Sequence, residues 1–351
     1  MLRCGASDGV GNDAAAQSKG GEVVAEELGV LILGAGRVSN GHSRAIAETP
    51  GARLAGIFDI DRGRVETFSA QHGCPGWTDL ETALWEADAQ VVMIGVPNHL
   101  HAPMMIAAAE AGKHVFVEKP MANTIEECDE MIRVIERTGV KVLIAHSQRY
   151  FASTIRAREL VQGGELGTPI FATDTWYKPF GMAARLPWFL DRAKGGGMWL
   201  MNGAHMIDRT CWTLDSEVVA VKALITTKFH DIQADDANMA LLQLKSGAYA
   251  TIVHAGYKER GINKCEVEIT CTGGMVRFDS YSNMLEVDKD GAFEPETLTR
   301  LNPFAEELKN LVGAINGTEE LRLTPQWGRH IVAVLEACEE SSRSGREVMV
   351  R

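Results

Sequence analysis

Glu118 and Lys119 are the residues whose types and placement first point to chemistry. They follow a short apolar run, residues 115–117, and come directly before Pro120. An apolar run bounded in this way indicates a buried strand, and the proline pushes Lys119 away from helical geometry. The pattern therefore predicts a lysine held rigidly at the carboxyl end of a core strand. An unpaired cation is uncommon at such a position, which indicates a functional role.

Two glycines point to a second kind of chemistry, the binding of a dinucleotide. Gly34 and Gly36 come directly after the apolar run "VLIL" and before a predicted helix, with Arg37 and Val38 next in the chain. Glycines there allow a tight turn and let backbone N–H groups approach a pyrophosphate. The third glycine of the full motif is absent, because Ser39 holds its place. Glycine-rich turns also arise for steric reasons alone.

Asp59 strengthens the cofactor interpretation. It ends the next apolar run, "ARLAGIFD", 23 residues after Gly36, near the spacing at which an acid binds ribose hydroxyls. A carboxylate there repels a 2′-phosphate, so Asp59 predicts NAD and makes NADP the less favoured cofactor. Arg62 and Arg64 could soften this preference, and a plain strand-end role for Asp59 is the alternative.

The elements that must position these residues form an α/β pattern. Apolar runs alternate with helical segments up to residue 147, which predicts a Rossmann domain with a doubly wound parallel sheet. One predicted helix, "TIEECDEMIRVIERTG", has a capping box from Thr124 to Glu127 and ends at Gly139.

Beyond residue 147 the sequence becomes rich in strands. Hairpin turns are predicted at Ser246-Gly247 and Gly273-Gly274, so the second sheet should be largely antiparallel and open. Helices are expected from Pro303 and Pro325. We therefore predict a flexible leader over residues 1–27, a dinucleotide-binding domain over 28–147 and an α+β substrate domain over 148–351.

The composition excludes several classes of partner. A net charge of −12 without a basic face argues against nucleic acid and anionic membranes. No apolar run approaches the roughly 18 residues of a membrane span. Seven cysteines form no CxxC pair, which suits reduced thiols, and the first 27 residues lack the apolar stretch of a secretory signal. We expect a cytoplasmic protein that acts on a small molecule.

Five stretches of the chain resemble the Gfo/Idh/MocA family of nicotinamide-dependent oxidoreductases. In order along the chain they are "GAGRVSNGH", "GVPNHLHAPMMIAAAEAGKHVFVEKPMA", "AHSQRY", "GGGMWLMNGAHMID" and "EACEESSRSGREV". The resemblance implies a Rossmann domain followed by a substrate domain whose open sheet forms oligomer contacts. A homo-oligomer, a dimer or a tetramer, is therefore expected.

The resemblance also places Lys119 beside the nicotinamide and the reacting carbinol oxygen. The pKa of free lysine is about 10.4, so a base near neutrality needs a pKa roughly 2 to 3 units lower. Burial and the positive charge of NAD⁺ both act in that direction. By the same resemblance the cofactor pocket is lined by four further residues: Pro97, Asn98, His101 and Glu118.

The stretch from Asn98 to His101 could also suggest a metal. Two histidines at i, i+2 with no nearby carboxylate or thiolate make a poor zinc site, so no metal is predicted.

A departure from the family occurs in the substrate domain. His205 matches the family histidine, but Met201 stands where the family has an aspartate, four residues earlier. Positions i and i+4 share a helix face, so the methionine removes the acid that would pair with His205. Asn202 and Asp208, three residues away on either side, could reach the same face. Proton transfer would then depend on Lys119 and His205.

The segment "TWYKPFGMAARLPWFLDR" supplies aromatic and cationic side chains that suit a hydroxylated or carboxylated substrate. The candidates are Tyr177, Lys178, Arg185, Trp188 and Arg192. The tryptophans at 176, 188 and 199 could equally be core residues. Further contacts are implied for the residues after the sixth predicted strand: His146, Gln148 and Arg149.

These features predict an NAD-dependent dehydrogenase or reductase that acts on a CH–OH group of a sugar, an inositol or a cyclic dihydrodiol. Met201 and the tryptophans favour a less polar ring over an unmodified sugar. Two alternatives stay open. One is an NAD-binding regulatory protein without turnover, supported only by the missing aspartate. The other is a family member that uses bound NAD for chemistry without net redox change.

Overall fold

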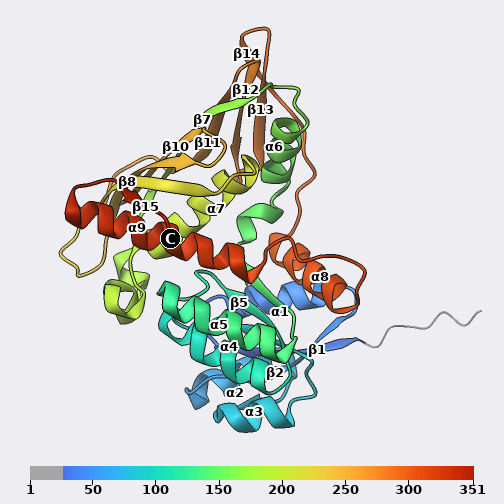
Figure 1. Ribbon diagram of the computed structural model, residues 1–351. Helices are drawn as coiled ribbons and strands as arrows, with labels where there is room; N and C mark the ends of the chain where they lie inside the picture. Colours follow the sequence, from blue (N-terminus) through green and yellow to red (C-terminus); the bar gives the residue numbers. More distant parts are fainter. Residues whose placement is uncertain (1–26) are drawn as a thin grey trace, which may run out of the picture.

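The computed structural model describes residues 27–351, so the predicted leader, residues 1–27, lies outside the described residues except for its last position. Figure 1 shows two sheets, one above the other in this view, with a long helix, α9 (Pro325–Ser344), running between them. Within residues 27–351 no helix has the length and apolar character needed to cross a bilayer.

The first sheet is the predicted Rossmann sheet. It is parallel, with the strand order β3-β2-β1-β4-β5-β6. Its strands are β1 (Leu28–Leu33), β2 (Ala52–Phe58), β3 (Gly76–Trp77), β4 (Val91–Ile94), β5 (His114–Glu118) and β6 (Val142–Ala145). The order reverses between β1 and β4, and such a switch point opens a crevice at the carboxyl ends of the strands.

Helices cover both faces of this sheet. The first face packs against α1 (Ser39–Glu48), α2 (Arg62–His72) and α8 (Pro303–Ile315). The second face packs against α3 (Leu80–Glu86), α4 (His101–Glu110) and α5 (Ile125–Thr138). The predicted capping box of α5 is confirmed: Thr124 accepts from the backbone N–H of Glu127, and Glu127 accepts from that of Thr124. Gly139 ends α5 in the left-handed conformation.

The second sheet is mixed and mostly antiparallel, as predicted, with the order β14-β13-β12-β11-β7-β10-β9-β8-β15. Its strands are β7 (Pro169–Pro179), β8 (Val218–Thr226), β9 (Ala237–Leu244), β10 (Tyr249–Tyr257), β11 (Lys264–Cys271), β12 (Gly274–Asp279), β13 (Met284–Lys289), β14 (Ala292–Pro295) and β15 (Val348–Met349). Its central strands β7 and β10 run parallel. Both predicted hairpins are confirmed, since Gly247 links β9 to β10 and Gly273 links β11 to β12.

One face of the second sheet is covered by α6 (Ala152–Gln162), α7 (Ala204–Thr213) and α9. We call this the inner face. On β7 the buried positions of this face alternate with partly exposed ones: Ala172, Asp174 and Trp176 are buried and face the helices. Alternation therefore decides which side chains of β7 can reach the cleft.

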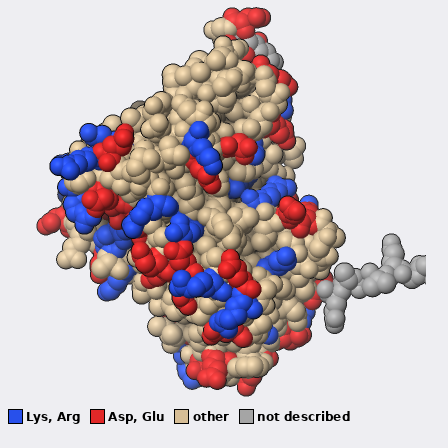
Figure 2. All heavy atoms as spheres, viewed as in Figure 1, with Lys and Arg blue, Asp and Glu red and all other residues tan. Residues whose placement is uncertain are grey.

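The two halves of the molecule interleave at the end of the chain. α8 falls in the predicted substrate domain, yet Leu308 and Leu311 pack in the core of the first sheet. α9 serves both cores: Val332 and Ala333 contact the first, whereas Ile331 contacts the second. On the face shown in Figure 2, charges of both signs intermingle over α5 and α9.

Candidate active site

The turn between β1 and α1 has the shape of a phosphate cradle. Gly34 has φ of +103°, and a Cβ there would meet the carbonyl oxygen of Gly95 at 2.7 Å. Gly36 faces open space, since a Cβ added to it would have no neighbour within 4 Å. No side chain caps the N-terminus of α1, whose N-cap is Val38. Free backbone N–H groups beside open space suit the pyrophosphate of a dinucleotide.

Asp59 lies at the end of β2, beside this turn, and is largely buried. Its carboxylate accepts from the backbone N–H of Ala35 at 2.9 Å and from that of Asp61 at 2.9 Å. A cavity of about 310 Å3 is lined by Gly36 of the turn and by residues of α1 and α2, among them Asn40 and Arg64. The position and hydrogen-bonding capacity of Asp59 therefore fit an adenosine ribose next to the cradle.

Lys119 follows β5 at the carboxyl edge of the first sheet and is 7% exposed. Its Nζ donates to the carbonyl oxygen of Met201 at 3.1 Å, and the sulfur of Met201 is 4.0 Å away. Burial lowers the pKa of Lys119, Glu118 and Glu307 oppose this, and Arg185 adds to the lowering. The predicted direction of the pKa change is therefore the one that the structure produces.

Glu118 points to the other side of the strand end and pairs with a histidine. His42 Nε2 lies 3.0 Å from Glu118 Oε1, and the imidazole is buried in α1. Burial raises the pKa of Glu118, but the hydrogen bond and charge of His42 lower it below its ordinary value. The sequence interpretation did not single out His42, although it lies in the quoted stretch "GAGRVSNGH".

The segment after β4 ties the two halves together. Asn98, in the short helix η1 (Asn98–Leu100), donates to the carbonyl oxygen of Gly195 at 2.7 Å. The ring nitrogens of His101 lie 2.8 Å from the carbonyl oxygen of Pro120 and 3.0 Å from that of Val96. His101 is therefore placed to hold this segment, which begins at Pro97, against the segment that carries Lys119.

The helix that carries His205 begins with an irregular turn. Residues Trp199–Gly203 form a π-helical turn, η6, directly before α7. The backbone N–H of Trp199 donates to Asp235 Oδ2 at 2.7 Å, which fixes the start of the turn. Met201 and the buried Asn202 lie within it. The expected i, i+4 relation between Met201 and His205 is therefore not that of a regular α-helix, and π-turns are frequent at functional sites.

His205 is 8% exposed, and its Nδ1 is buried without a hydrogen-bond partner. Burial lowers the pKa of His205 well below its ordinary value, and the charges of Lys119, His146, Arg209 and Lys178 act in the same direction. The imidazole is therefore neutral.

Asp208 does not pair with His205, contrary to the possibility raised from the sequence. Its carboxylate is fully buried and accepts from Arg149 Nε at 2.9 Å, from Arg149 Nη2 at 2.6 Å and from Trp327 Nε1 at 2.8 Å. His146 Nδ1 lies 3.6 Å from Asp208, and the His146 ring meets His205 edge to face at 6.1 Å. His146 thus lies between Asp208 and His205, and Asp208 holds Arg149, a residue that follows β6, in place.

Lys178 reaches the cleft from the inner face of the second sheet. Its Nζ lies 5.3 Å from the ring centre of Trp176, and that ring is 6.3 Å from His205. Tyr177 belongs to the opposite face, because its partners in the sheet, Ala255 and Lys264, alternate with buried positions. Alternation along β7 therefore separates Tyr177 from the other predicted substrate residues.

Arg185 and Trp188 lie in the loop after β7. Arg185 donates to the carbonyl oxygen of Phe180 at 2.9 Å, and its guanidinium is 4.1 Å from the ring centre of Phe189. Trp188 precedes Phe189 in the short helix η4 (Pro187–Leu190), and its Nε1 is buried without a partner. Both residues thus belong to one small aromatic cluster, with Phe180 and Met198 in its core.

Two buried polar residues were missed by the sequence interpretation. Glu307, on α8, is 0% exposed, and neither of its carboxyl oxygens has a hydrogen-bond partner. His254, on β10, is 1% exposed, and neither ring nitrogen has a partner. No local signal marks His254. Glu307 could have been noticed, because it shares a helical face with the apolar Leu311 and Ala314.

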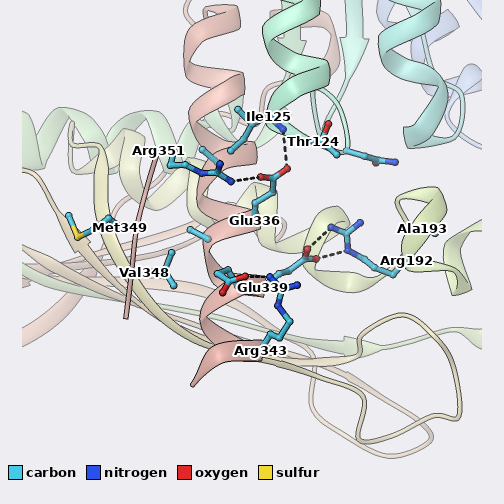
Figure 3. A pocket seen from close by; sticks show the side chains of 14 residues that line it. Thr124, Ile125, Arg192, Ala193, Glu336, Glu339, Arg343, Val348, Met349 and Arg351 are labelled. Atoms are coloured by element: carbon cyan, nitrogen blue, oxygen red, sulfur yellow. Dashed lines mark hydrogen bonds and ion pairs between the residues drawn. The ribbon is translucent and has the colours of Figure 1, made fainter. Parts of the chain in front are cut away.

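A second and larger cavity lies outside this cleft (Figure 3). It has a volume of about 740 Å3 and lies between the N-terminus of α5, the short helix η5 (Arg192–Lys194), α9 and the end of the chain. Its main charged groups are paired: Arg192 forms a two-point contact with Glu339 at 2.5 and 2.6 Å, and Glu336 accepts from the backbone N–H of Ile125. This cavity therefore lies at the interface between the two halves and is lined by residues of both.

Comparison with known proteins agrees with this architecture. Two family models match: the oxidoreductase family with an NAD-binding Rossmann fold over residues 28–146, and the GFO/IDH/MocA C-terminal domain over residues 154–277. An inositol 2-dehydrogenase of Rhizobium meliloti is 25% identical over 330 residues, which cover 91% of this chain and 98% of that protein.

Two further similarities concern a shorter match and a solved structure. A 1-carboxy-3-chloro-3,4-dihydroxycyclohexa-1,5-diene dehydrogenase of Comamonas testosteroni is 31% identical over 189 residues, 54% of this chain and 46% of that protein. The structure of an aldose-aldose oxidoreductase from Caulobacter crescentus, complexed with glycerol, superposes with a TM-score of 0.85 at 28% identity. That match covers 92% of this chain and 100% of the other.

Proposed function

Since this chain belongs to the Gfo/Idh/MocA family of oxidoreductases with an NAD-binding Rossmann fold, we propose that it is an NAD-dependent dehydrogenase or reductase acting on a CH–OH group. The observation that carries the proposal is the buried Lys119 at the carboxyl edge of the Rossmann sheet, with a lowered pKa. It lies within electrostatic reach of the neutral His205. This arrangement offers a proton acceptor and a neutral hydrogen-bonding group at one place.

Oxidation of a secondary alcohol releases one hydride and one proton and leaves a ketone. When bound, NAD⁺ supplies the hydride acceptor. Lys119 Nζ takes the proton from the carbinol oxygen, because burial favours its neutral form. His205 orients the same oxygen by a hydrogen bond. General acid–base catalysis of this kind contributes about 10²- to 10⁴-fold to a rate.

The cofactor is NAD, and the substrate is a polyhydroxylated small molecule. Asp59 supports NAD, since its carboxylate beside the phosphate cradle repels a 2′-phosphate. Relatives named as an inositol 2-dehydrogenase and as a dehydrogenase of a carboxylated dihydroxycyclohexadiene support a ring that bears vicinal hydroxyls.

The active form is a homo-oligomer that associates through the outer face of the second sheet. That face exposes a set of large apolar side chains: Phe171, Leu224, Met239, Leu241 and Tyr249. Exposed apolar patches of this kind mark interaction surfaces, and a second copy of the chain presents the same surface in a twofold arrangement.

The test is absorbance at 340 nm while the protein meets a panel of inositols, sugars and cyclic diols, with NAD⁺ and NADP⁺ in separate reactions. We expect a rise with NAD⁺ that falls at least 100-fold in Lys119→Met. Lys141→Met is the matched control, because Lys141 is an exposed lysine at the opposite end of the neighbouring strand. Bound NAD without reduction by any panel member would contradict the dehydrogenase proposal.

A further inference from the structure

The cleft beside His205 holds cations that have no acidic partner. In residues 27–351, neither Lys178 nor Arg185 forms an ion pair, and Arg37 at the cradle has none either. Two buried arginines of the same domain are paired: Arg209 binds Asp174, and Arg149 binds Asp208. Lys178 and Arg185, both partly buried at the cleft, therefore lack the ion pairs that these arginines have.

The pKa of Lys178 also reflects the excess of positive charge in the cleft. Burial lowers the pKa of Lys178, and Arg185, Lys119 and Arg37 act in the same direction, so that the pKa falls to about 8. Among the main influences, the thiol of Cys265 is the one that raises it. Two arginines, Arg185 and Arg37, are thus among the main electrostatic influences on Lys178, whereas no carboxylate is among them.

Neutral donors complete the cleft. His254 is paired across the strands with Trp176, so both side chains project from the inner face. Burial lowers the pKa of His254 to about 3, and Lys178, Arg209 and Arg185 act in the same direction. The neutral imidazole keeps one N–H, and the buried Trp188 Nε1 is also without a partner. These groups can donate hydrogen bonds to an anion without adding charge.

We propose that the substrate carries an anionic group, a carboxylate or a phosphate monoester, which binds Lys178 and Arg185. The proposal rests on the dehydrogenase function, because it names the class of molecule oxidised at the same site. Its binding test, however, needs no turnover. The pyrophosphate of the cofactor has its own cradle at α1, whereas Lys178 projects from β7 against Trp176.

The experiment measures binding of three probes to the NAD⁺-saturated protein by calorimetry: cyclohexanecarboxylate, cyclohexyl phosphate and the neutral cyclohexanecarboxamide. None has a hydroxyl to oxidise, so failure of the anion proposal and failure of the dehydrogenase proposal are separable. We expect at least one anion to bind roughly 10- to 100-fold more tightly than the amide. The tighter of the two anions identifies the group.

Variants locate the effect. Lys178→Met should remove the preference for the anion and leave binding of the amide unchanged, and Lys178→Arg should restore the preference. Lys245→Met, at an exposed lysine in the hairpin after β9, should change neither. Equal affinity of the wild type for the anions and the amide would overturn the proposal. So would an anion preference that survives in Lys178→Met.

The pH dependence gives a second readout. Free Lys178 loses its charge as the pH rises through about 8, so affinity for the anion should fall above that pH. The groups that face Lys178 are Arg185, Lys119, Arg37, Cys265, Arg209 and the two neutral histidines, His205 and His254. In Lys178→Arg this fall should be absent. A fall of equal size in that variant would contradict the role of Lys178.

Discussion

At the scale of single residues, Glu307 stands out because an acidic side chain is fully buried and neither of its carboxyl oxygens has a hydrogen-bond partner. Burial raises the pKa of Glu307 well above its ordinary value, Glu118 and Asp208 add to the rise, and Lys119 opposes it. Burial therefore favours the protonated, neutral form of this side chain. Glu307 is thus a carboxylic acid, near enough to Lys119 to influence its pKa, whose neutral form is favoured.

This protonated state predicts a pH-dependent effect on stability. Below about pH 4.3 a glutamate is protonated in both the folded and the unfolded chain, so it costs no stability. As the pH rises, the unfolded chain ionises while folded Glu307 resists, and the fold loses stability. Glu307→Gln should remove this loss and raise the melting temperature more at pH 8 than at pH 5.

Thermal unfolding at the two pH values is the measurement. Glu306→Gln is the matched control, since the carboxylate of the neighbouring Glu306 is partly exposed and lies 3.9 Å from Lys309 Nζ. It should shift the melting temperature equally at both values. An equal shift for Glu307→Gln would show that Glu307 is ionised in the fold.

Residues differ in how far the sequence could predict their surroundings. Lys119 was predictable, because the strand, the proline and the lysine are adjacent in the chain, and the structure gives it the buried strand end. The surroundings of His254 were not, because Trp176, Lys178 and Arg209 come from distant segments. The position of Tyr177 was also not predictable, since only the register of β7 shows that its side chain lies on the outer face of the sheet.

At the scale of elements, the two glycines of the β1–α1 turn should separate stability from binding. Gly34→Ala forces a positive φ and a contact with the carbonyl of Gly95, which should destabilise the protein by about 1–3 kcal/mol. Gly36→Ala has open space, so it should keep the fold and weaken NAD binding, because its methyl group occupies the path of the pyrophosphate.

Chemical denaturation and titration with NADH fluorescence test this pair. We expect a lower denaturation midpoint for Gly34→Ala alone, and a weaker cofactor affinity for Gly36→Ala at unchanged stability. An unchanged affinity in Gly36→Ala would place the phosphates elsewhere.

The π-turn marks where sequence reasoning about elements fails. In a regular α-helix Met201 and His205 would lie on the same face. The π-helical turn Trp199–Gly203, however, widens the helix before α7 begins. Its carbonyl at Met201 is thereby presented to Lys119. The turn is fixed by Asp235, from a segment more than thirty residues away, so local periodicity carries no sign of it.

At the scale of the whole molecule, the outer face of the second sheet predicts the oligomeric state. Met239 and Leu241 lie on β9 and are 55% and 46% exposed on this face. The double variant Met239→Lys, Leu241→Lys should reduce the mass in solution to that of one chain, because lysines there would be desolvated and mutually repelled. Light scattering after size exclusion measures this mass.

The control replaces two exposed apolar side chains of the Rossmann half, Ile60 and Trp85, by lysine. It should leave the mass unchanged. An oligomer that survives in the sheet variant, or a wild type that is already one chain, would contradict the proposed contact.

α9 has a consequence for how the molecule comes apart. Neighbouring positions on this one helix belong to different cores, Ile331 to one and Val332 to the other. The helix cannot leave either core without exposing apolar surface of the second. A scanning calorimeter should therefore record one heat-absorption peak, with a calorimetric enthalpy equal to the van't Hoff enthalpy. The chain has two sheets by architecture but melts as a single cooperative unit.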